Sequence, residues 1–497
     1  MKKTLYTIVC LLLLFNCKEK EEEKNLLSPE ALKIEETVLK QKELFDAPGI
    51  VIGMIKNDTI IYKGAHGVKS LNTKDSLTTT SLFHMASVSK PFVATAIVQL
   101  VEQGKVDLDE KLTHYLPYYT MADERYKDIT IKQMLAHTSG IPNTGDYEWD
   151  KPQYDDGAAE RYARSQKTEV LDFEPGTAYS YSNPAFDILC DVIAKASGMT
   201  FEDYMKQHIF EPIGMKNSTF FKPEVPKDLA TQPHVFGDSL QNEVSDIYPY
   251  NRRHAGSSTL HSNVEDMLLW AQVYLNKGMI NGKQIYSEAS YELLTTVHTP
   301  KDERKVCLSW FPGRINESPI YYHNGQDTGF NSFFGFMPEK KSAIVMMTNT
   351  DYFWRQSNAA IILKNIIFND TLRTRGPIHF KLKDYVLTDG IEKVKEVYFE
   401  EKQKSPQDYT FDSGGIDDLG YWLIDRNYLK EALEVFMFNT ELEPEHAGWV
   451  DSVADAYKAM DSIDLAIKWY EKALEMKPDQ DFSQKKLKEL LESQPKG

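Results

Sequence analysis

Ser87 and Lys90 stand three residues apart at the start of a segment with helical periodicity, a spacing of almost one helical turn. This spacing brings the lysine ammonium beside the serine hydroxyl, where a cation lowers the free energy of forming an alkoxide. At a helix N-terminus the backbone N–H of Ser87 is also unpaired, so it can stabilise an oxyanion formed on acylation. The pair therefore predicts a serine nucleophile activated by a lysine.

By itself this pattern has little specificity. The same Ser-x-x-Lys spacing occurs at Ser483 and Lys486, in a C-terminal helical region where we expect only a structural role. Two further elements that could complete such a site, Tyr-x-Asn and His-x-Gly, are each found at three places in the chain. The order of the three elements along the chain and the residues that flank them must show which copies could form an active site.

An ordered series of motifs surrounds the first copy. The series consists of His84-Met85-Ala86-Ser87-Val88-Ser89-Lys90-Pro91, Gly104-Lys105-Val106-Asp107-Leu108-Asp109, Leu135-Ala136-His137-Thr138-Ser139-Gly140-Ile141-Pro142, Pro175-Gly176-Thr177, Tyr181-Ser182-Asn183, His323-Asn324-Gly325 and Gly329-Phe330-Asn331-Ser332. In this order, over about residues 40 to 370, it resembles the class C β-lactamase-related branch of the penicillin-recognising serine hydrolases.

The resemblance implies roles for individual residues. Ser87 would be the nucleophile, and Lys90 with Tyr181 would move its proton to the leaving group. A nearby cation favours the phenolate, so tyrosine is a reasonable base beside a lysine. The alternative for Tyr181 is that it is one more packed aromatic side chain. His137, which follows a predicted helix, is expected to be structural rather than catalytic.

The resemblance also implies a substrate-binding set. Asn183 would hydrogen bond to the substrate's acyl amide and to the lysine, although it could instead be a turn residue. His323 and Gly325 would line the edge strand of the site, and the backbone N–H of Gln326 would be the second oxyanion donor beside that of Ser87.

One departure from the family pattern concerns the substrate. True class C β-lactamases have a lysine where this chain has His323, and a lysine is a permanent cation suited to the antibiotic's carboxylate. Histidine is mostly neutral near pH 7. A histidine at this position resembles the pattern of D-amino-acid peptidases, D,D-carboxypeptidases and esterase-like relatives. No residue can be assigned as a dedicated deacylating glutamate.

The elements that must position these residues come from both ends of one domain. We predict a hairpin over 50–55 and 60–62, helices over 87–103, 187–196, 200–209, 264–275 and 354–368, and strands over 305–310, 319–323, 330–337 and 342–347. The fold class is therefore α/β (α+β). It has one β-lactamase/transpeptidase-like mixed sheet flanked by helices, with a helical insert.

A repeat of 34 residues marks the C-terminus. Gly420, Ala432, Phe436, Leu442 and Pro444 recur as Ala454, Ala466, Tyr470, Met476 and Pro478. This period resembles the tetratricopeptide repeat, and a helix over 482–491 would cap the open end. The all-α repeats could bind a protein partner in a groove, or they could simply pack on the catalytic domain.

The N-terminus is typical of an export signal. Lys2 and Lys3 precede an apolar run over 5–15 that is too short for a permanent transmembrane helix, and Cys17 then resembles a bacterial lipidation site. We expect the protein to be exported and anchored to a bacterial membrane by lipid, including palmitate, attached to Cys17. The outer membrane is favoured, on its periplasmic or surface-exposed side. A plain secretory signal is the alternative.

These observations divide the chain into five parts. They are a signal peptide (1–17), a charged tether (18–30), the hydrolase domain (31–370), a linker (371–415) and the tetratricopeptide-like repeats (416–494). The length of 497 residues is consistent with more than one domain.

Composition narrows the classes of partner. A net charge of −17 disfavours nucleic acid and anionic membranes, and favours a small-molecule or peptide substrate. No metal or organic cofactor is implied, because the sequence has no His-Glu-x-x-His, paired cysteines or phosphate-binding glycine loop. Cys190 and Cys307 have apolar neighbours, so we expect buried thiols.

The leading hypothesis is a serine hydrolase that acts through a covalent acyl-enzyme on an ester or a D-amino-acid peptide or amide bond. A β-lactamase proper is the second. The third is a surface binding protein that uses its repeats, with the hydrolase domain as a relic. The presence of Ser87, Lys90 and Tyr181 argues against a relic.

Overall fold

The computed structural model describes residues 27–351, 357–370 and 374–493. The predicted signal peptide, Cys17 and nearly all of the tether lie outside the described residues. Helix α1 (Pro29–Leu44) begins inside the range predicted as tether, because Ser28 caps it by accepting the N–H of Ala31. None of the helices within the described ranges is long and apolar enough to cross a membrane.

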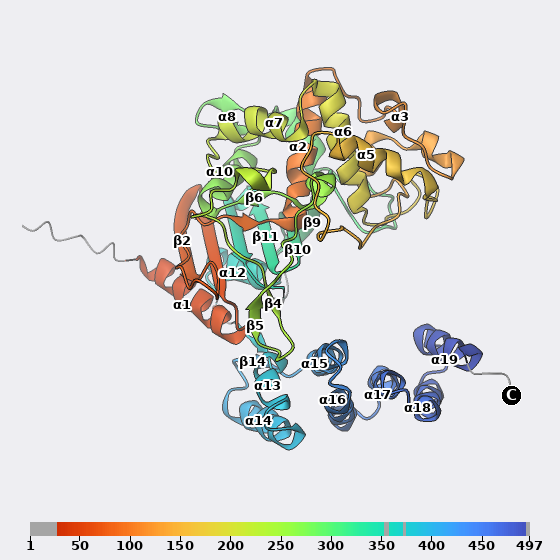
Figure 1. Cartoon of the computed structure of the whole chain (residues 1–497). Helices are drawn as coiled ribbons and strands as arrows, with labels where there is room; N and C mark the ends of the chain where they lie inside the picture. The colour runs from red at the N-terminus through yellow and green to blue at the C-terminus, as the bar shows by residue number, and fades with distance from the viewer. Residues whose placement is uncertain (1–26, 352–356, 371–373, 494–497) are drawn as a thin grey trace, which may run out of the picture.

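A six-stranded antiparallel sheet forms the centre of the catalytic part, in the order β2-β1-β12-β11-β10-β9 (Figure 1). The strands are β1 (Gly49–Lys56), β2 (Thr59–Gly67), β9 (Phe311–Ile315), β10 (Ser318–Asp327), β11 (Phe330–Met337) and β12 (Ser342–Thr348). β1 pairs with β12 across nearly 300 residues of sequence, from Ile50 with Thr348 to Ile55 with Ala343. The prediction of one sheet built from both ends of the domain is confirmed.

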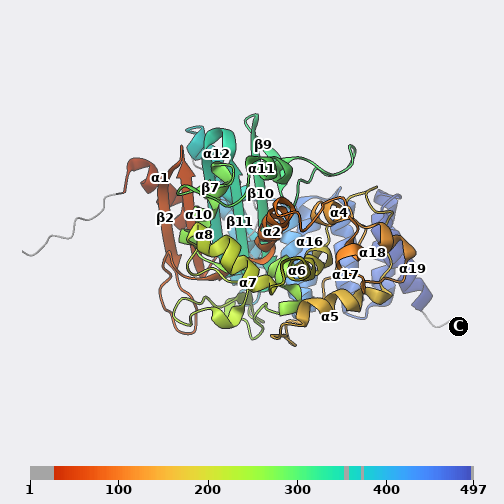
Figure 2. The ribbon, with the colours of Figure 1, turned by 90° about the horizontal axis from the view of Figure 1, so that it is seen from above.

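Both faces of the sheet are covered by helices, which explains its almost unbroken apolar strands. Val51, Ile55 and Val345 belong to one buried cluster with helices α2 (Lys90–Glu102) and α10 (Val264–Leu275). Alternate residues such as Ile52 and Ile344 belong to a second cluster with α1 and α12 (Ser357–Ile367). Seen from above, α12 lies toward one edge of the molecule, and the insert helices α5 and α7 lie toward the opposite edge (Figure 2).

The helical insert lies between β2 and β9. Its other helices are α3 (Leu112–Tyr115), α4 (Ile131–Leu135), α5 (Ala158–Ser165), α6 (Asn183–Ser197), α7 (Phe201–Met205), α8 (Glu211–Ile213), α9 (Ala255–Ser258) and α11 (Glu288–Thr295). Short strand pairs join them: β3 (Phe83–His84) with β6 (His261–Ser262), β4 (His234–Phe236) with β5 (Asn242–Val244), and β7 (Met279–Ile280) with β8 (Lys283–Gln284).

Three predicted elements differ from the structure. The strand predicted over 305–310 is wrong, because this buried segment bonds to loops: His298 N–H donates to Val306 O, and Ser309 N–H donates to Leu135 O. The helix predicted over 200–209 is α7 followed by a π-helical turn (Lys206–Phe210). The helix predicted from Ser87 begins with a 3₁₀ turn, and α2 itself starts at Lys90.

The segment predicted as a linker is folded. It contains α13 (His379–Val386) and α14 (Ile391–Lys404), and β13 (Gly376–Pro377) pairs in parallel with β14 (Tyr409–Thr410). Leu382, Val394 and Val397 are buried in one cluster with the helices that follow. Many charged residues separate these apolar positions in the sequence, so the pattern was not identified as helical.

The C-terminal region consists of helices α15 (Ser413–Asp425), α16 (Leu429–Leu442), α17 (Ala447–Ala459), α18 (Ile463–Met476) and α19 (Asp481–Ser493), which lie in a row below the sheet (Figure 1). α15 and α17 begin 34 residues apart (447 − 413), as do α16 and α18 (463 − 429). Gly420 lies where a Cβ would collide with the ring of Phe436, so a small residue is needed at this crossing. The region is helical with the expected period, while its assignment as tetratricopeptide repeats stays a prediction.

The second Ser-x-x-Lys pair lies in α19 and has a structural role. Ser483 Oγ donates to Asp451, and Lys486 Nζ lies 2.6 Å from a carboxylate oxygen of Asp451 and of Asp455. Both side chains hold α19 against α17.

Candidate active site

Ser87, the predicted nucleophile, lies in a tight turn. Ser87 belongs to the 3₁₀ turn Ala86–Ser89, which connects β3 to α2, and its side chain is partly exposed. The preceding residue, Ala86, has φ of 47°, a left-handed conformation that L-residues with a side chain adopt at a cost of about 1–2 kcal/mol. The strained turn presents Ser87 at the end of the sheet.

Lys90 is fully buried beside the serine. Its ammonium donates to Ser87 Oγ at 2.9 Å and to the carbonyl oxygen of Ser257 at 2.8 Å. Burial lowers the pKa of Lys90 to about 7, against the opposing effect of the negative charges of Asp187 and Asp327. A neutral lysine is therefore well populated near neutral pH and can accept the serine proton.

Tyr181 lies beside Ser87 and Lys90. Its ring centroid lies 4.9 Å from Lys90 Nζ, and its side chain hydrogen bonds to that of Ser87. Burial raises the pKa of Tyr181, and this outweighs the opposing effect of the hydrogen bond from Ser87. Burial thus favours the neutral phenol, whereas the prediction was a phenolate base, so the role of Tyr181 as a base stays a prediction.

Asn183 is the first residue of α6 and points into the site. Its amide nitrogen donates to the hydroxyl of Tyr147 rather than approaching Lys90, so the predicted contact with the lysine is not formed. Its Oδ1 is buried and has no hydrogen-bond partner among the described residues. This oxygen is suited to accept a substrate N–H.

His323 lies on β10 and is almost completely buried. Its Nδ1 donates to the carbonyl oxygen of Asn324 at 2.7 Å, and its Nε2 has no partner among the described residues. Burial, followed by the positive charge of Lys90, lowers the pKa of His323 to about 3. The imidazole is neutral, as the sequence analysis expected.

Gly325 brings β10 against the nucleophile turn. A Cβ at this position would lie 2.6 Å from Ser332 Oγ and 2.9 Å from Ser87 N, and it would also collide with the carbonyl oxygen of Met85. Glycine is therefore required by close approach rather than by contact with substrate. The next residue, Gln326, has an exposed side chain that reaches Asp351 O, and the oxyanion role of its backbone N–H stays a prediction.

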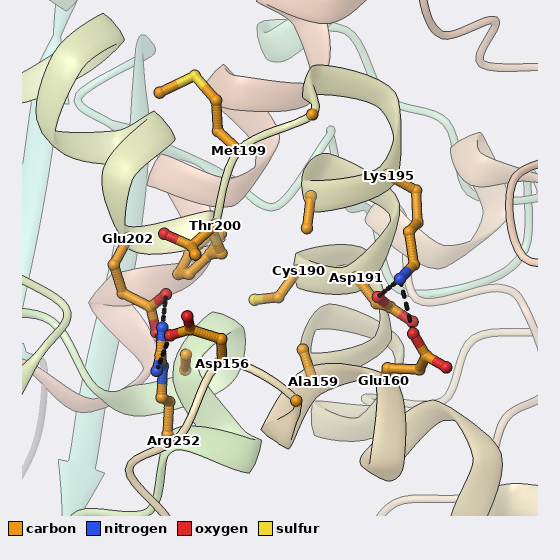
Figure 3. A pocket seen from close by; sticks show the side chains of 15 residues that line it. Asp156, Ala159, Glu160, Cys190, Asp191, Lys195, Met199, Thr200, Glu202 and Arg252 are labelled. Carbon is orange, nitrogen blue, oxygen red and sulfur yellow. Dashed lines mark hydrogen bonds and ion pairs between the residues drawn. The ribbon is translucent and has the colours of Figure 1, made fainter.

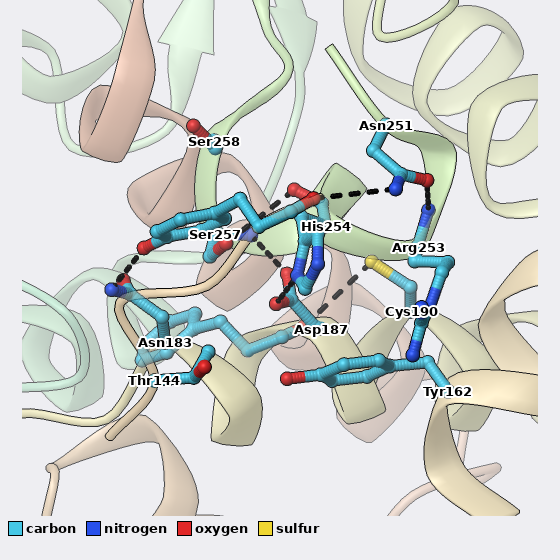
Figure 4. A network of polar contacts seen from close by, with 12 residues as sticks. Thr144, Tyr162, Asn183, Asp187, Cys190, Asn251, Arg253, His254, Ser257 and Ser258 are labelled. Atoms are coloured by element: carbon cyan, nitrogen blue, oxygen red, sulfur yellow. Dashed lines mark hydrogen bonds and ion pairs between the residues drawn. The ribbon is translucent and has the colours of Figure 1, made fainter. Parts of the chain in front are cut away.

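A buried network behind Lys90 was missed by the sequence analysis (Figure 4). Asp187 accepts the N–H of Ser257 at 2.8 Å and lies 2.8 Å from Nδ1 of His254. Since the carbonyl of the same Ser257 receives the ammonium of Lys90, this network fixes the lysine's partner. The available signal was a carboxylate at Asp187 between the apolar residues Phe186 and Ile188.

A second missed network lies at the end of β10. Asp327 accepts hydrogen bonds from Ser258 Oγ and from His84 Nε2, the latter at 2.8 Å. His84 directly precedes Met85 and the nucleophile turn. The two networks place the carboxylates of Asp187 and Asp327 near Lys90, and each carboxylate raises the pKa of Lys90.

His137 has a positioning role rather than a catalytic one. Its Nδ1 accepts the N–H of Ser182 at 3.1 Å, its carbonyl oxygen accepts the N–H of Ser180, and its ring stacks on Tyr181 at 4.3 Å. Burial lowers the pKa of His137 well below its usual value. The neutral ring holds the segment that carries Tyr181.

Cys190 and Cys307 are buried free thiols, as predicted, and burial raises the pKa of each. Cys190 lines a pocket of about 380 Å³ between α5, α6 and α7 (Figure 3). On one wall Arg252 pairs with Glu202 and Asp156, and on the other Lys195 pairs with Glu160. The pocket contains none of the three predicted catalytic residues.

Comparison with known proteins supports this geometry. The family model described as Beta-lactamase matches residues 40–365. Protein flp of Staphylococcus aureus strain MW2 is 25% identical over 305 residues, which cover 61% of this chain and 59% of flp. Penicillin-binding protein 4 of Amycolatopsis lactamdurans is 26% identical over 330 residues, covering 62% of this chain and 84% of that protein.

Two solved structures share the fold. The octameric penicillin-binding protein homologue from Pyrococcus abyssi superposes with a TM-score of 0.61 at 23% identity, over 68% of this chain and 77% of that chain. SurE superposes with a TM-score of 0.57 at 19% identity, over 70% of this chain and 80% of that chain. At these identities the likeness concerns the fold alone.

Proposed function

Because this chain belongs to the Beta-lactamase family, we propose that it is a serine hydrolase that cleaves an ester or D-amino-acid peptide or amide bond through an acyl-enzyme on Ser87. One observation carries the proposal: Ser87 Oγ lies 2.9 Å from the ammonium of a fully buried Lys90 whose pKa is lowered to about 7.

The first half of the reaction forms the acyl-enzyme. Neutral Lys90 takes the Ser87 proton as Oγ bonds to the substrate's carbonyl carbon, and the carbonyl electron pair moves to oxygen. The backbone N–H groups of Ser87 and Gln326 stabilise that oxyanion. When the intermediate collapses, the bond to the leaving nitrogen or oxygen breaks. Tyr181 protonates this leaving atom and is reprotonated by Lys90.

The second half releases the acid. Water attacks the acyl carbon, gives its proton to the Lys90–Tyr181 pair, and expels Ser87 Oγ, which recovers a proton. The orphan Oδ1 of Asn183 accepts an N–H of the acyl group and so favours peptide-like substrates. A β-lactamase proper is the second candidate, supported by the family match. The neutral His323 argues against a β-lactamase, because a neutral imidazole offers no positive charge for the antibiotic's carboxylate.

Substitution of the nucleophile tests the proposal. Ser87→Ala should reduce ester hydrolysis by at least about a thousandfold and abolish labelling by a fluorophosphonate or a fluorescent penicillin. Ser483→Ala is the matched control, because it alters the same Ser-x-x-Lys pattern away from the site. Turnover retained by a folded Ser87→Ala variant would disprove the assignment.

A further inference from the structure

The hairpin of β4 and β5 connects the rim of the candidate site to the C-terminal helices. It lies between the central sheet and the helices α13 and α15 (Figure 1). The two strands pair through three residues each, and a hairpin of this size has little stability of its own. Its position is therefore determined by the contacts that its tip and its base make.

The tip of the hairpin is held by the C-terminal helices. Leu240 is completely buried in the cluster that these helices form, together with Leu382 of α13 and Leu419 of α15. Leu240 has φ of 59°, a left-handed conformation that a leucine adopts only where the surrounding structure enforces it. The next residue, Gln241, donates from its side chain to Asp384 of α13 at 3.1 Å.

The base of the hairpin packs against the turn between β10 and β11. A Cβ at Gly329 in this turn would collide with Pro233 and would lie 2.6 Å from the backbone nitrogen of His234. His234 is itself fixed, because its Nδ1 donates to the carbonyl oxygen of Asn349 at 2.8 Å and its Nε2 accepts the N–H of Leu71 at 3.0 Å. The base and the turn are therefore in close, well-determined contact.

Asp351 joins the base of the hairpin to the site. Its N–H donates to the carbonyl oxygen of His234 at 3.3 Å, and its carboxylate accepts the N–H of Gly329. Its carbonyl oxygen accepts the side-chain amide of Gln326 at 3.3 Å. In the proposed mechanism the backbone N–H of Gln326 is the second oxyanion donor. Direct contacts thus connect the buried tip at Leu240 with a residue of the site.

We propose that the C-terminal helices are a positioning element for acylation: by holding Leu240 they fix the hairpin, and through it the turn that places the backbone N–H of Gln326 at the oxyanion. The inference rests on the proposed function. It gives the helical region a task in catalysis beyond packing on the hydrolase domain. Leu240 is a positioning residue in this scheme, and Ser87 and Lys90 perform the chemistry.

Truncation of the tip residue in the full-length chain tests the proposal. At a temperature at which the variant is fully folded, Leu240→Ala should slow fluorophosphonate labelling of Ser87 by about tenfold or more. The kcat for an ester should fall by the same factor, while KM stays within about twofold. Hydrogen exchange of the backbone amides over 324–331 should become faster.

Two further variants separate positioning from stability. Leu240→Met keeps the volume of the side chain and should retain the wild-type labelling rate within about twofold. Leu490→Ala is the matched control, because it removes the same atoms from a buried leucine in a separate cluster on α19. It should leave both the labelling rate and the exchange over 324–331 unchanged.

A folded Leu240→Ala variant with wild-type labelling and exchange would overturn the inference, and so would equal slowing in Leu490→Ala. If Leu240→Ala does not fold, Arg426→Ala replaces it, since Arg426 follows α15 and donates to the carbonyl oxygens of Phe236 and Gly237 in the hairpin. Failure of the proposed function is a separate result, namely no Ser87-dependent labelling in the wild type. Hydrogen exchange over 324–331 then decides whether the helices hold the turn.

Discussion

At the scale of single residues, the site depends on the burial of one lysine. Lys90 is surrounded by protein, and its ammonium has only Ser87 and the carbonyl of Ser257 as hydrogen-bond partners among the described residues. The lost hydration disfavours the charged form, and the nearby carboxylates oppose this effect without cancelling it. Burial thus favours a neutral lysine near pH 7 and the protonated form of Tyr181, as the proposed mechanism requires.

The pH dependence of acylation follows from this balance. Because only neutral Lys90 accepts the serine proton, kcat/KM should rise with pH through an apparent pKa of about 7. In Asp187→Asn the loss of a negative charge should move this pKa to lower values, since Asp187 favours the charged lysine. A pH–rate profile on a neutral ester measures both. A profile that falls with pH in this range, or a shift to higher pH in the variant, would contradict the assignment.

At the scale of elements, the decisive contact is that of β10 against the 3₁₀ turn. The strand approaches the turn so closely that no side chain fits at Gly325. Asp327 at the end of the strand also bonds to His84, which directly precedes the turn. Strand and turn are therefore positioned as one unit.

A methyl group at this contact should separate the two elements. We expect Gly325→Ala to destabilise the protein by about 1–3 kcal/mol, as overpacking does, and to slow fluorophosphonate labelling by about a hundredfold. The control is Gly313→Ala on β9, where a Cβ would meet only side-chain atoms at 3.3 Å and 3.5 Å. Thermal unfolding and labelling rates give the two quantities. Equal labelling rates in the two variants would show that the approach of β10 is not needed for catalysis.

At the scale of the whole molecule, the C-terminal helices are docked on the catalytic part. Arg426, which directly follows α15, donates to the carbonyl oxygens of Phe236 and Gly237, and Trp422 packs on the ring of Phe236 at 5.2 Å. Phe236 belongs to β4, and Pro233 just before this strand lies against Gly329 at the rim of the site. The two parts therefore meet through a segment that also borders the active site.

Removal of this docking contact should loosen the two parts from one another. Arg426→Ala leaves two carbonyl groups without their charged donor, which should cost about 1–3 kcal/mol and allow the C-terminal helices to unfold separately. Arg161→Ala removes an exposed arginine paired with Asp155 and should change stability by less than about 0.5 kcal/mol. Calorimetry and limited proteolysis should show a second transition only in Arg426→Ala; a single cooperative transition would argue against separable parts.

The sequence by itself determined that one sheet is built from both ends of the domain, the family resemblance, and the residues predicted to lie at the centre of the site. These depend on local spacing and on hydrophobic periodicity, which a chain carries without its fold. The 34-residue helical period at the C-terminus was predictable for the same reason.

Only the tertiary structure decided which charges exist at the site. The lowered pKa of Lys90 and the protonated Tyr181 follow from burial, and burial is a property of packing rather than of sequence. The folded linker and the contact of Asp187 with Ser257 became visible only where residues far apart in the chain meet. The spacing of residues in the sequence predicts which side chains can react. Their protonation states depend on desolvation and on contacts between residues that are distant in the sequence.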